Sequence, residues 1–285
     1  MVESKFVADP NGITPVELHN DLYLKRDDLF KPFGDNAVNG GKLRQCFMLV
    51  DAVKNGYDGL ISCCSIYSPQ APITSYVAKH FGMKCVICYG GTTKERLRRF
   101  RMPTIVRNCG SEIRIISKSG IHKILYTKAK KIAAEENLFV VDYGFNITEY
   151  PDLLLNAVSN QVENIPDDLD NLVITCGSGI TTLGVLIGLH RFKKKVKNIY
   201  LICTAPNRKQ MIDSNLEKYG IHMEYNMIDL FHMKGFKYER GVRAECDGIV
   251  LHPNYEAKSY KWLTENIDTK KEKTLLWIVG SKPMT

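Results

Sequence analysis

A lysine that follows two glycines, in the stretch Asn39-Gly40-Gly41-Lys42, has the surroundings of a Schiff-base lysine. After Lys42, apolar residues recur at helical spacing as far as Gly56, so the pattern predicts a helix with Lys42 in its first turn. The positive end of the helix dipole disfavours a second positive charge there and favours the neutral amine, which is the form that attacks carbonyl groups. A surface lysine at a helix start has the same local pattern, so other segments must decide.

A glycine-rich turn, Cys176-Gly-Ser-Gly-Ile-Thr-Thr-Leu-Gly184, follows an apolar strand and opens a helix. Backbone amides at a helix start, joined by hydroxyl groups, suit a phosphate. A dinucleotide fingerprint is excluded because the third glycine comes two residues late, and a Walker loop is excluded because Gly-Lys-Ser/Thr is absent. A monophosphate cofactor or substrate remains, with a glycine-rich turn that binds no ligand as the alternative. The predicted ligands are Gly177, Ser178, Gly179, Ile180, Thr181 and Thr182.

Two further strand-to-helix junctions carry polar groups. Ser68, with free amides at the start of the helix that Gln70 begins, could hold a substrate carboxylate, and Gln70 is also predicted to bind substrate. Glu256 could pair with a protonated pyridine nitrogen, and Tyr255 could donate or accept a proton. An amine for an aldehyde and amides for a phosphate together describe pyridoxal 5'-phosphate. Each junction by itself is also an ordinary helix start.

The elements that must position these residues alternate between strands and helices along the chain. Strands are predicted at 22–25, 58–64, 84–89, 112–117, 138–142, 172–176, 199–204, 249–251 and 275–279, with helices in most of the intervals. One of these is a basic helix, capped by Thr92, over 94–107. The alternation predicts an α/β protein built on parallel sheets, with ligands at the carboxyl ends of strands.

In this order, the four segments resemble the fold type II pyridoxal-phosphate enzymes, whose best match is the 1-aminocyclopropane-1-carboxylate deaminase and D-cysteine desulfhydrase family. The resemblance rests on 22–29, on Gly40-Gly-Lys-Leu-Arg44 and on 247–258. It implies a tryptophan-synthase-beta-like fold, with a large cofactor-binding domain (1–47 and 157–285), a small substrate domain (48–156) and the cofactor between them. It also implies a Lys42 aldimine, a phosphate held around Ser178 to Thr181, Glu256 at the pyridine nitrogen, and Tyr255 and Ser68 facing substrate.

The chain departs from that family at two of these places. Gly41 stands where the family has Asn before the lysine, and Ser68-Pro69-Gln70 stands where it has Ser-Asn-Gln or Ser-Asn-His. An amide side chain that would contact the cofactor or substrate is therefore missing, and Pro69 removes a backbone donor. Cofactor use carries over from the family, whereas the substrate and the exact reaction do not.

Three functions follow. The first is a lyase or deaminase acting at the alpha or beta carbon of a small amino acid. The second is an enzyme of the same chemistry that remodels, for example by decarboxylation, an amino-acid-modified thymine in phage DNA; the altered loop and the basic segment from Lys94 to Arg107 fit it. The third is a non-catalytic binding protein, against which the intact Lys42 and Glu256 argue.

Composition sets the remaining expectations. Nine scattered cysteines fit a reducing compartment, and neither a signal segment nor a membrane span is visible, so a cytoplasmic protein is expected. A homodimer is also expected, with no membrane or metal partner. Cys85-Val-Ile-Cys88 lacks the partner pair that a zinc site needs. The formal net charge of +8 leaves nucleic acid open as a partner, although no nucleic-acid-binding motif is found.

Overall fold

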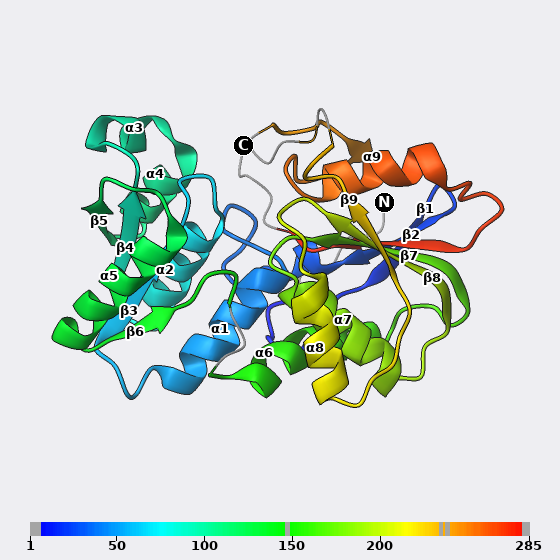
Figure 1. Cartoon of the computed structure of the whole chain (residues 1–285), viewed down its shortest axis with the longest axis horizontal. Coiled ribbons are helices and arrows are strands. Elements are labelled where there is room, and N and C mark those ends of the chain that lie inside the picture. The colour runs from blue at the N-terminus through cyan, green and yellow to red at the C-terminus, as the bar shows by residue number, and fades with distance from the viewer. Residues whose placement is uncertain (1–6, 146–148, 234–235, 237–239, 281–285) are drawn as a thin grey trace. The chain divides into compact units, whose positions relative to one another are not determined.

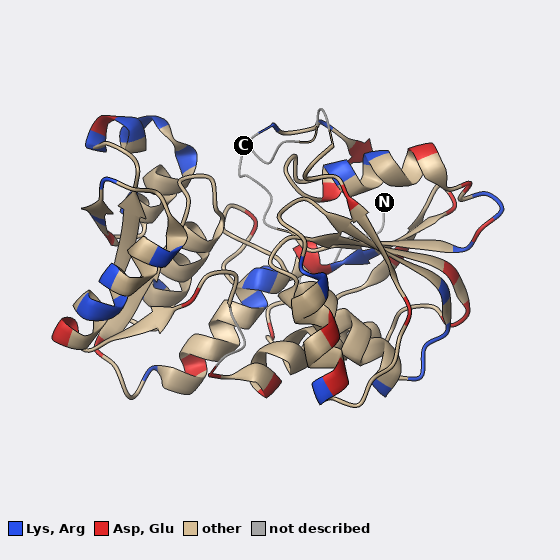
Figure 2. Cartoon of the chain, in the orientation of Figure 1, with Lys and Arg blue, Asp and Glu red and all other residues tan. Residues whose placement is uncertain are grey.

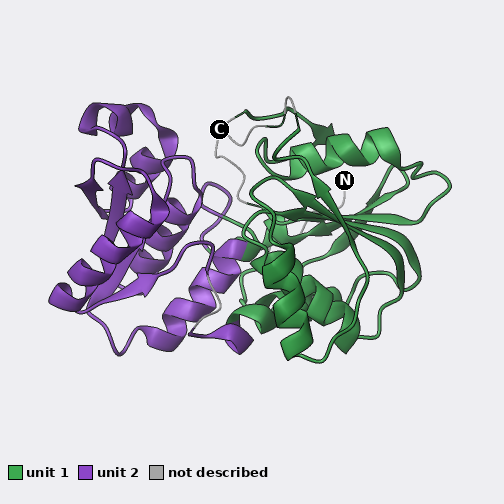
Figure 3. Cartoon of the chain, in the orientation of Figure 1, with its two compact units in different colours: residues 1–32, 39–41, 154–285 green, residues 33–38, 42–153 purple. Residues whose placement is uncertain are grey.

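The structure is a computed structural model that describes residues 7–145, 149–233, 236 and 240–280. The chain divides into two compact units (Figure 3). Unit 1 comprises residues 1–32, 39–41 and 154–285, and unit 2 comprises residues 33–38 and 42–153.

Unit 1 is built on a six-stranded sheet in the order β1-β2-β12-β7-β8-β9. Only β1 is antiparallel to its neighbour, and the other strands are parallel. The strands are β1 (Val16–His19), β2 (Leu22–Arg26), β7 (Leu169–Cys176), β8 (Val196–Cys203), β9 (Asn226–Asp229) and β12 (Thr274–Ile278), with a separate hairpin of β10 (Glu245–Cys246) and β11 (Ile249–Val250). The central strands β12 and β7 are almost wholly buried, which explains their continuous apolar runs.

Helices cover both faces of this sheet (Figure 1). Helix α9 (Glu256–Asn266) packs Ala257 and Leu263 against Val173 and Leu276, and the opposite face carries α6 (Pro151–Ser159), α7 (Ile180–Arg191) and α8 (Lys209–Lys218). Short 3-10 turns follow β2 and α6, at Asp27–Leu29 (η1) and Asn160–Val162 (η2). Burial on both faces makes the carboxyl edge of the sheet the place where polar loops can gather.

Unit 2 is built on a four-stranded, wholly parallel sheet in the order β5-β4-β3-β6. Its strands are β3 (Gly59–Cys63), β4 (Lys84–Gly90), β5 (Glu112–Ser117) and β6 (Leu138–Val141). Its helices are α1 (Gly41–Val53, whose first residue belongs to unit 1), α2 (Gln70–His80), α3 (Lys94–Arg99), α4 (Arg101–Asn108) and α5 (His122–Glu136). Ile61, Cys63 and Val86 form an apolar cluster with α5.

The predicted basic helix is two helices, which corrects the sequence interpretation. Phe100 has extended backbone (φ −99°, ψ 140°) and separates α3 from α4. A continuous helix would place Pro103, which has no N–H and whose ring would meet the carbonyl of Arg99, in a helix interior. Thr93, not Thr92, caps α3, since its side chain accepts a hydrogen bond from the Arg96 amide. The short strands β1, β9 and β10 have no strong sequence signal, and only β1 and β9 belong to the main sheet.

Within the described ranges, every helix is too short or too polar to span a lipid bilayer.

Candidate active site

The glycine-rich turn of unit 1 forms a cradle between the end of β7 and the start of α7. Gly179 is the N-cap of α7 and has φ +86°, a conformation that side chains other than glycine rarely adopt. The Oγ1 atoms of Thr181 and Thr182 are buried and have no hydrogen-bond partner among the described residues. Buried polar groups are nearly always paired, so two such hydroxyls at a helix N-terminus fit an anionic ligand, such as a phosphate.

Two residues that the sequence analysis did not select lie beside this cradle. Thr204 follows β8, the neighbour of β7, and its amide donates to the Cys176 carbonyl (3.1 Å). Arg208 approaches Gly179 so closely that a Cβ there would lie 3.2 Å from Arg208 Cβ. Thr204 Oγ1 and Arg208 Nε are also buried without a hydrogen-bond partner among the described residues. The adjacent-strand rule for parallel sheets is the one signal that could have found them.

Glu256 begins α9 and is almost fully buried. Its Oε1 accepts hydrogen bonds from the amides of Val279 (2.9 Å) and Gly280 (3.2 Å), which follow β12. Because β12 lies next to β7, this places Glu256 at the same sheet edge as the cradle. Its Oε2 is buried and has no partner within the described chain. Burial raises the pKa of Glu256 to about 8, against the lowering effect of its backbone hydrogen bonds.

Tyr255 connects the Glu256 segment with the cradle. A Cβ on Gly177 would lie 3.7 Å from Tyr255 Cε1, so the phenol ring lies beside the first glycine of the turn. The ring also contacts His252, with 4.8 Å between ring centroids. Unit 1 therefore brings together three of the predicted features: the Gly177–Thr182 turn, Tyr255 and Glu256.

Unit 2 holds the other predicted residues. Lys42 lies in the first turn of α1, as the sequence indicates. Its Nζ donates to the Gly144 carbonyl (2.8 Å) and lies 5.5 Å from the centre of the Phe145 ring. The amine is half-buried and is held by the loop that follows β6.

Gln70 holds that same loop. Its Oε1 accepts from the Gly144 amide (2.8 Å), and its Nε2 donates to Ser62 Oγ and to the Asp142 carbonyl (2.9 Å each). Gln70 is buried, and its side chain is occupied by the protein itself. A contact between Gln70 and substrate stays a prediction, while the structure shows Gln70 holding the amide of Gly144, the residue whose carbonyl accepts from Lys42.

Ser68 lies two residues earlier and is also buried. Its amide donates to the Ser65 carbonyl, and its Oγ accepts a weak hydrogen bond from the Gln70 amide (3.3 Å). The hydroxyl retains acceptor capacity and its own proton. Its predicted role toward substrate therefore remains chemically open.

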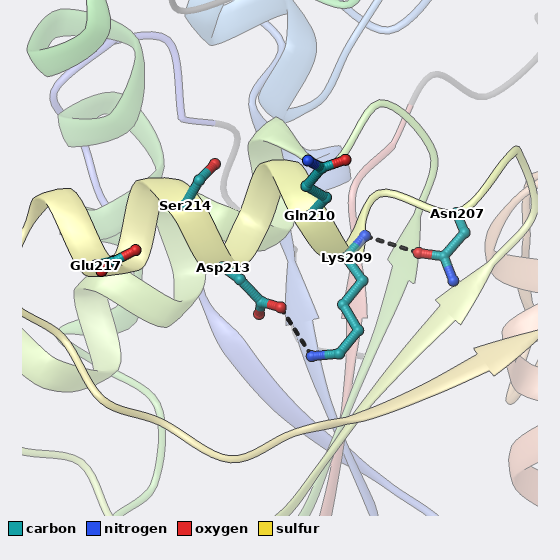
Figure 4. A pocket seen from close by; sticks show the side chains of 6 residues that line it. All are labelled: Asn207, Lys209, Gln210, Asp213, Ser214 and Glu217. Atoms are coloured by element: carbon teal, nitrogen blue, oxygen red, sulfur yellow. Dashed lines mark hydrogen bonds and ion pairs between the residues drawn. The ribbon is translucent and has the colours of Figure 1, made fainter.

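A separate hollow of about 610 Å³ lies against α8 (Figure 4). It is lined by Asn207, Lys209, Gln210, Asp213, Ser214 and Glu217. Its one lysine, Lys209, pairs with Asp213 at 2.9 Å, and we assign no ligand to it. Across the described residues, no group of three His, Cys, Asp or Glu side chains is arranged to hold a metal ion.

The family to which this architecture belongs is shown by comparison. The sequence model of the pyridoxal-phosphate dependent enzymes matches residues 7–234, so the chain belongs to that family. Pyridoxal phosphate is the cofactor of this enzyme, as the sequence predicts. The buried polar atoms without a hydrogen-bond partner at Thr181 and Thr182 fit the phosphate of this cofactor, and the one at Glu256 fits its ring nitrogen.

Particular relatives give a finer comparison. The chain is 27% identical, over 98% of its own length and 81% of the relative's, to an O-seryl-dTMP PLP-dependent decarboxylase of Salmonella phage ViI. It is 24% identical to a putative 1-aminocyclopropane-1-carboxylate deaminase of Thermotoga maritima, over 90% of this chain and 87% of the relative.

A solved structure of a homologue of that deaminase shares the fold, with a TM-score of 0.75 and 20% identity over 96% of this chain and 91% of the other. The cysteine synthase of Entamoeba histolytica shares it too, with a TM-score of 0.65 and 16% identity over 99% of this chain and 89% of the other. The predicted fold class, cofactor and enzyme class, a pyridoxal-phosphate-dependent lyase related to the 1-aminocyclopropane-1-carboxylate deaminases, are confirmed.

Proposed function

We propose that this enzyme acts on an amino-acid group carried by a thymidine nucleotide and removes its carboxylate. The observation that carries the proposal is the likeness to the phage O-seryl-dTMP decarboxylase, which extends over nearly the whole chain. The Ser68-Pro69-Gln70 loop supports it, because this loop departs from the Ser-Asn-Gln/His pattern expected of deaminases that take small amino acids.

Lys42, Glu256 and the cradle would hold the cofactor. Lys42 Nζ of unit 2 would supply the amine for its aldehyde, the Thr181 and Thr182 hydroxyls of unit 1 would bind its phosphate, and Glu256 Oε2 of unit 1 would pair with its ring nitrogen. When bound, pyridoxal phosphate supplies an electron sink for the pair released at the substrate's alpha carbon.

The protein's own groups control the protons of this reaction. Because burial raises the pKa of Glu256 to about 8, the carboxyl can keep one proton between Oε2 and the ring nitrogen near neutral pH. Lys42 Nζ, when it is a free amine, would deliver a proton to the alpha carbon of the substrate. Overall, the bond between the alpha carbon and the carboxylate breaks, carbon dioxide leaves, and a proton takes its position.

A second candidate is deamination of a small free amino acid. It is favoured by several relatives named 1-aminocyclopropane-1-carboxylate deaminase, which are 22–29% identical to this chain. The same lysine would then act at the alpha or beta carbon, with ammonia as a product.

Product analysis separates the two candidates. The holoenzyme is incubated with O-seryl-dTMP, with 1-aminocyclopropane-1-carboxylate and with D-cysteine. Release of carbon dioxide and formation of the matching amine from the nucleotide support the proposal. Ammonia and a 2-oxo acid from either amino acid, with the nucleotide unchanged, would replace it with the second candidate. Lys42→Ala is the control, and it should abolish any turnover and any borohydride-fixed cofactor.

We also propose a homodimer in a reducing, cytoplasmic compartment. All nine cysteines are free thiols, and eight of them are buried, which supports the compartment. Light scattering on the purified holoenzyme tests the dimer.

A further inference from the structure

A cationic and aromatic surface of unit 2 lies beside the loop that contains Ser68. We define the α3 surface as Tyr67, Lys94, Arg96, Arg98, Phe100 and Arg101. Figure 2 shows lysine and arginine gathered on α3 and at the start of α4. Between Lys94 and Arg107 there are six basic side chains and one acid, Glu95.

Few of these charges are neutralised by the protein. Glu95 pairs with Arg99, the next turn of the same helix. Lys94, Arg96 and Arg98 are exposed, and among the described residues none of the three has an acidic partner. Arg101 is partly buried, which lowers its pKa and adds a desolvated cation to the same surface. Uncompensated cations clustered on one helix attract a polyanion.

Aromatic rings connect this charge with the Ser68 loop. Tyr67 immediately precedes Ser68 and is 37% exposed. Its ring packs edge-on against Phe100 (5.2 Å between centroids), and Arg96 lies 5.6 Å from the centre of the Phe100 ring. Tyr67 Oη is also 3.5 Å from Arg96 Nη2. An exposed tyrosine beside arginine forks is the combination that binds stacked bases and phosphates of a single strand.

Sheet topology explains the juxtaposition. Strands β3 and β4 are parallel neighbours, with Cys63 opposite Cys88, so the loops that follow them leave the same edge. The first loop carries Tyr67 and Ser68, and the second leads into α3. In parallel sheets this edge is where ligands bind.

From this geometry we infer that the substrate is presented within a polynucleotide, and that the α3 surface binds the strand beside the modified nucleotide. The inference rests on the proposed function, because the polynucleotide is the molecule that would carry the thymidine adduct. It adds a partner class, single-stranded nucleic acid, and a site for its phosphates and bases. A duplex offers no exposed base faces, so the aromatic part of the surface favours an unpaired strand.

Anisotropy of a labelled single-stranded oligothymidylate, with the holoenzyme, measures this binding between about 50 and 200 mM salt. The test variant is Lys94→Gln/Arg96→Gln/Arg98→Gln. Loss of three phosphate contacts should reduce the slope of log K against log salt by about 2. At the lowest salt, affinity should fall by about tenfold or more.

The control variant, Lys79→Gln/Lys130→Gln/Lys131→Gln, removes the same charge from exposed lysines of unit 2. They lie in the second halves of α2 and α5, away from the carboxyl edge. This variant should bind within about twofold of the wild type if the surface is specific. Tyr67→Leu should weaken binding by about tenfold, and Tyr67→Phe should restore it, because stacking needs the ring and not the hydroxyl.

Three results would overturn the inference: equal binding by both triple variants, no effect of Tyr67→Leu, or competition by polyglutamate as strong as by oligothymidylate, which would assign the surface to acidic polypeptides. Turnover of free O-seryl-dTMP is measured in parallel and should be unaffected by the triple variants. Nucleotide turnover without strand binding leaves the proposed function standing and removes this inference. Strand binding without turnover of any thymidine adduct would remove the proposed function and leave the α3 surface as a strand-binding site only.

Discussion

At the scale of single residues, Glu256 is a carboxyl group whose buried environment disfavours its charged form. One oxygen of this carboxyl accepts from two backbone amides, and the other is buried without a partner in the described chain. Burying an unpaired polar atom in this way costs free energy on folding. A ligand that completes its hydrogen bonding would account for such a group, and in the proposed function the ring nitrogen of the cofactor would supply the missing hydrogen bond.

The pH dependence of stability tests this environment in cofactor-free protein. The folded pKa is about 8 and the ordinary value is 4.5, so the unfolded chain loses its proton first as pH rises. The stabilising contribution is complete below pH 4.5 and is lost between 4.5 and 8, by up to about 5 kcal/mol. Glu256→Gln removes the titration. Urea unfolding at pH 5 and pH 8 should therefore show the variant gaining on the wild type at the higher pH. A difference that does not change with pH would contradict the assignment.

Gln70 is the second residue with a specific expectation. Gln70→Ala leaves the Gly144 amide without its acceptor and frees the carbonyl to which Lys42 binds, so the amine loses its fixed position. We expect cofactor affinity, measured by absorbance titration, to fall about tenfold, the equivalent of one lost hydrogen bond. Gln70→Glu keeps an acceptor for the Gly144 amide and should recover part of the loss. Equal affinity in Gln70→Ala and wild type would show that Gln70 does not position Lys42.

At the scale of elements, the start of α7 forms the proposed phosphate site. The helix can begin next to β7 only because Gly179 takes a positive φ, and a Cβ there would overlap Met211 Cε. The turn therefore exposes its amides instead of covering them with a side chain.

Two alanine substitutions in the same turn compare a position that cannot accept a side chain without strain with one that can. Gly179→Ala should destabilise the protein by about 2 kcal/mol and weaken pyridoxal phosphate binding by tenfold or more, because left-handed backbone is strained with a Cβ. Gly177→Ala is the matched control, since its Cβ would meet only Tyr255 Cε1 at an ordinary 3.7 Å. Urea unfolding and absorbance titration of both variants provide the comparison. Similar losses in both would mean that the conformation of Gly179 is not the cause.

At the scale of the whole molecule, binding of the cofactor should stabilise the folded protein against unfolding. Free pyridoxal phosphate at a hundred times its dissociation constant should add about 2.7 kcal/mol to the free energy of unfolding. Pyridoxal, which lacks the phosphate, should add markedly less at equal concentration, because the cradle of unit 1 has nothing to bind. Thermal unfolding of the cofactor-free chain with each compound measures the difference. Equal stabilisation by both would remove the phosphate site from the cradle.

The sequence by itself determined the features that depend on local order. Lys42 follows two glycines at a helix start, the Gly177–Thr182 turn joins a strand to a helix, and Glu256 begins α9; each is encoded within about ten neighbouring residues. Alternating strands and helices likewise predicted the parallel sheets, because burial on both faces requires continuous apolar strands.

Tertiary structure decided the partners of these residues. Gln70 and Gly144 are 74 positions apart, and Arg208 reaches Gly179 only because β8 lies beside β7. Such contacts depend on strand order, which no local pattern contains. The same holds for the contact between Tyr67 and Phe100, because adjacent parallel strands bring together loops that the chain keeps well apart. The break at Phe100 is different, because Pro103 is a local signal for it that the predicted single helix overlooked. Residue type and local secondary structure are encoded in short stretches of sequence, whereas the pairing of strands depends on the whole sheet.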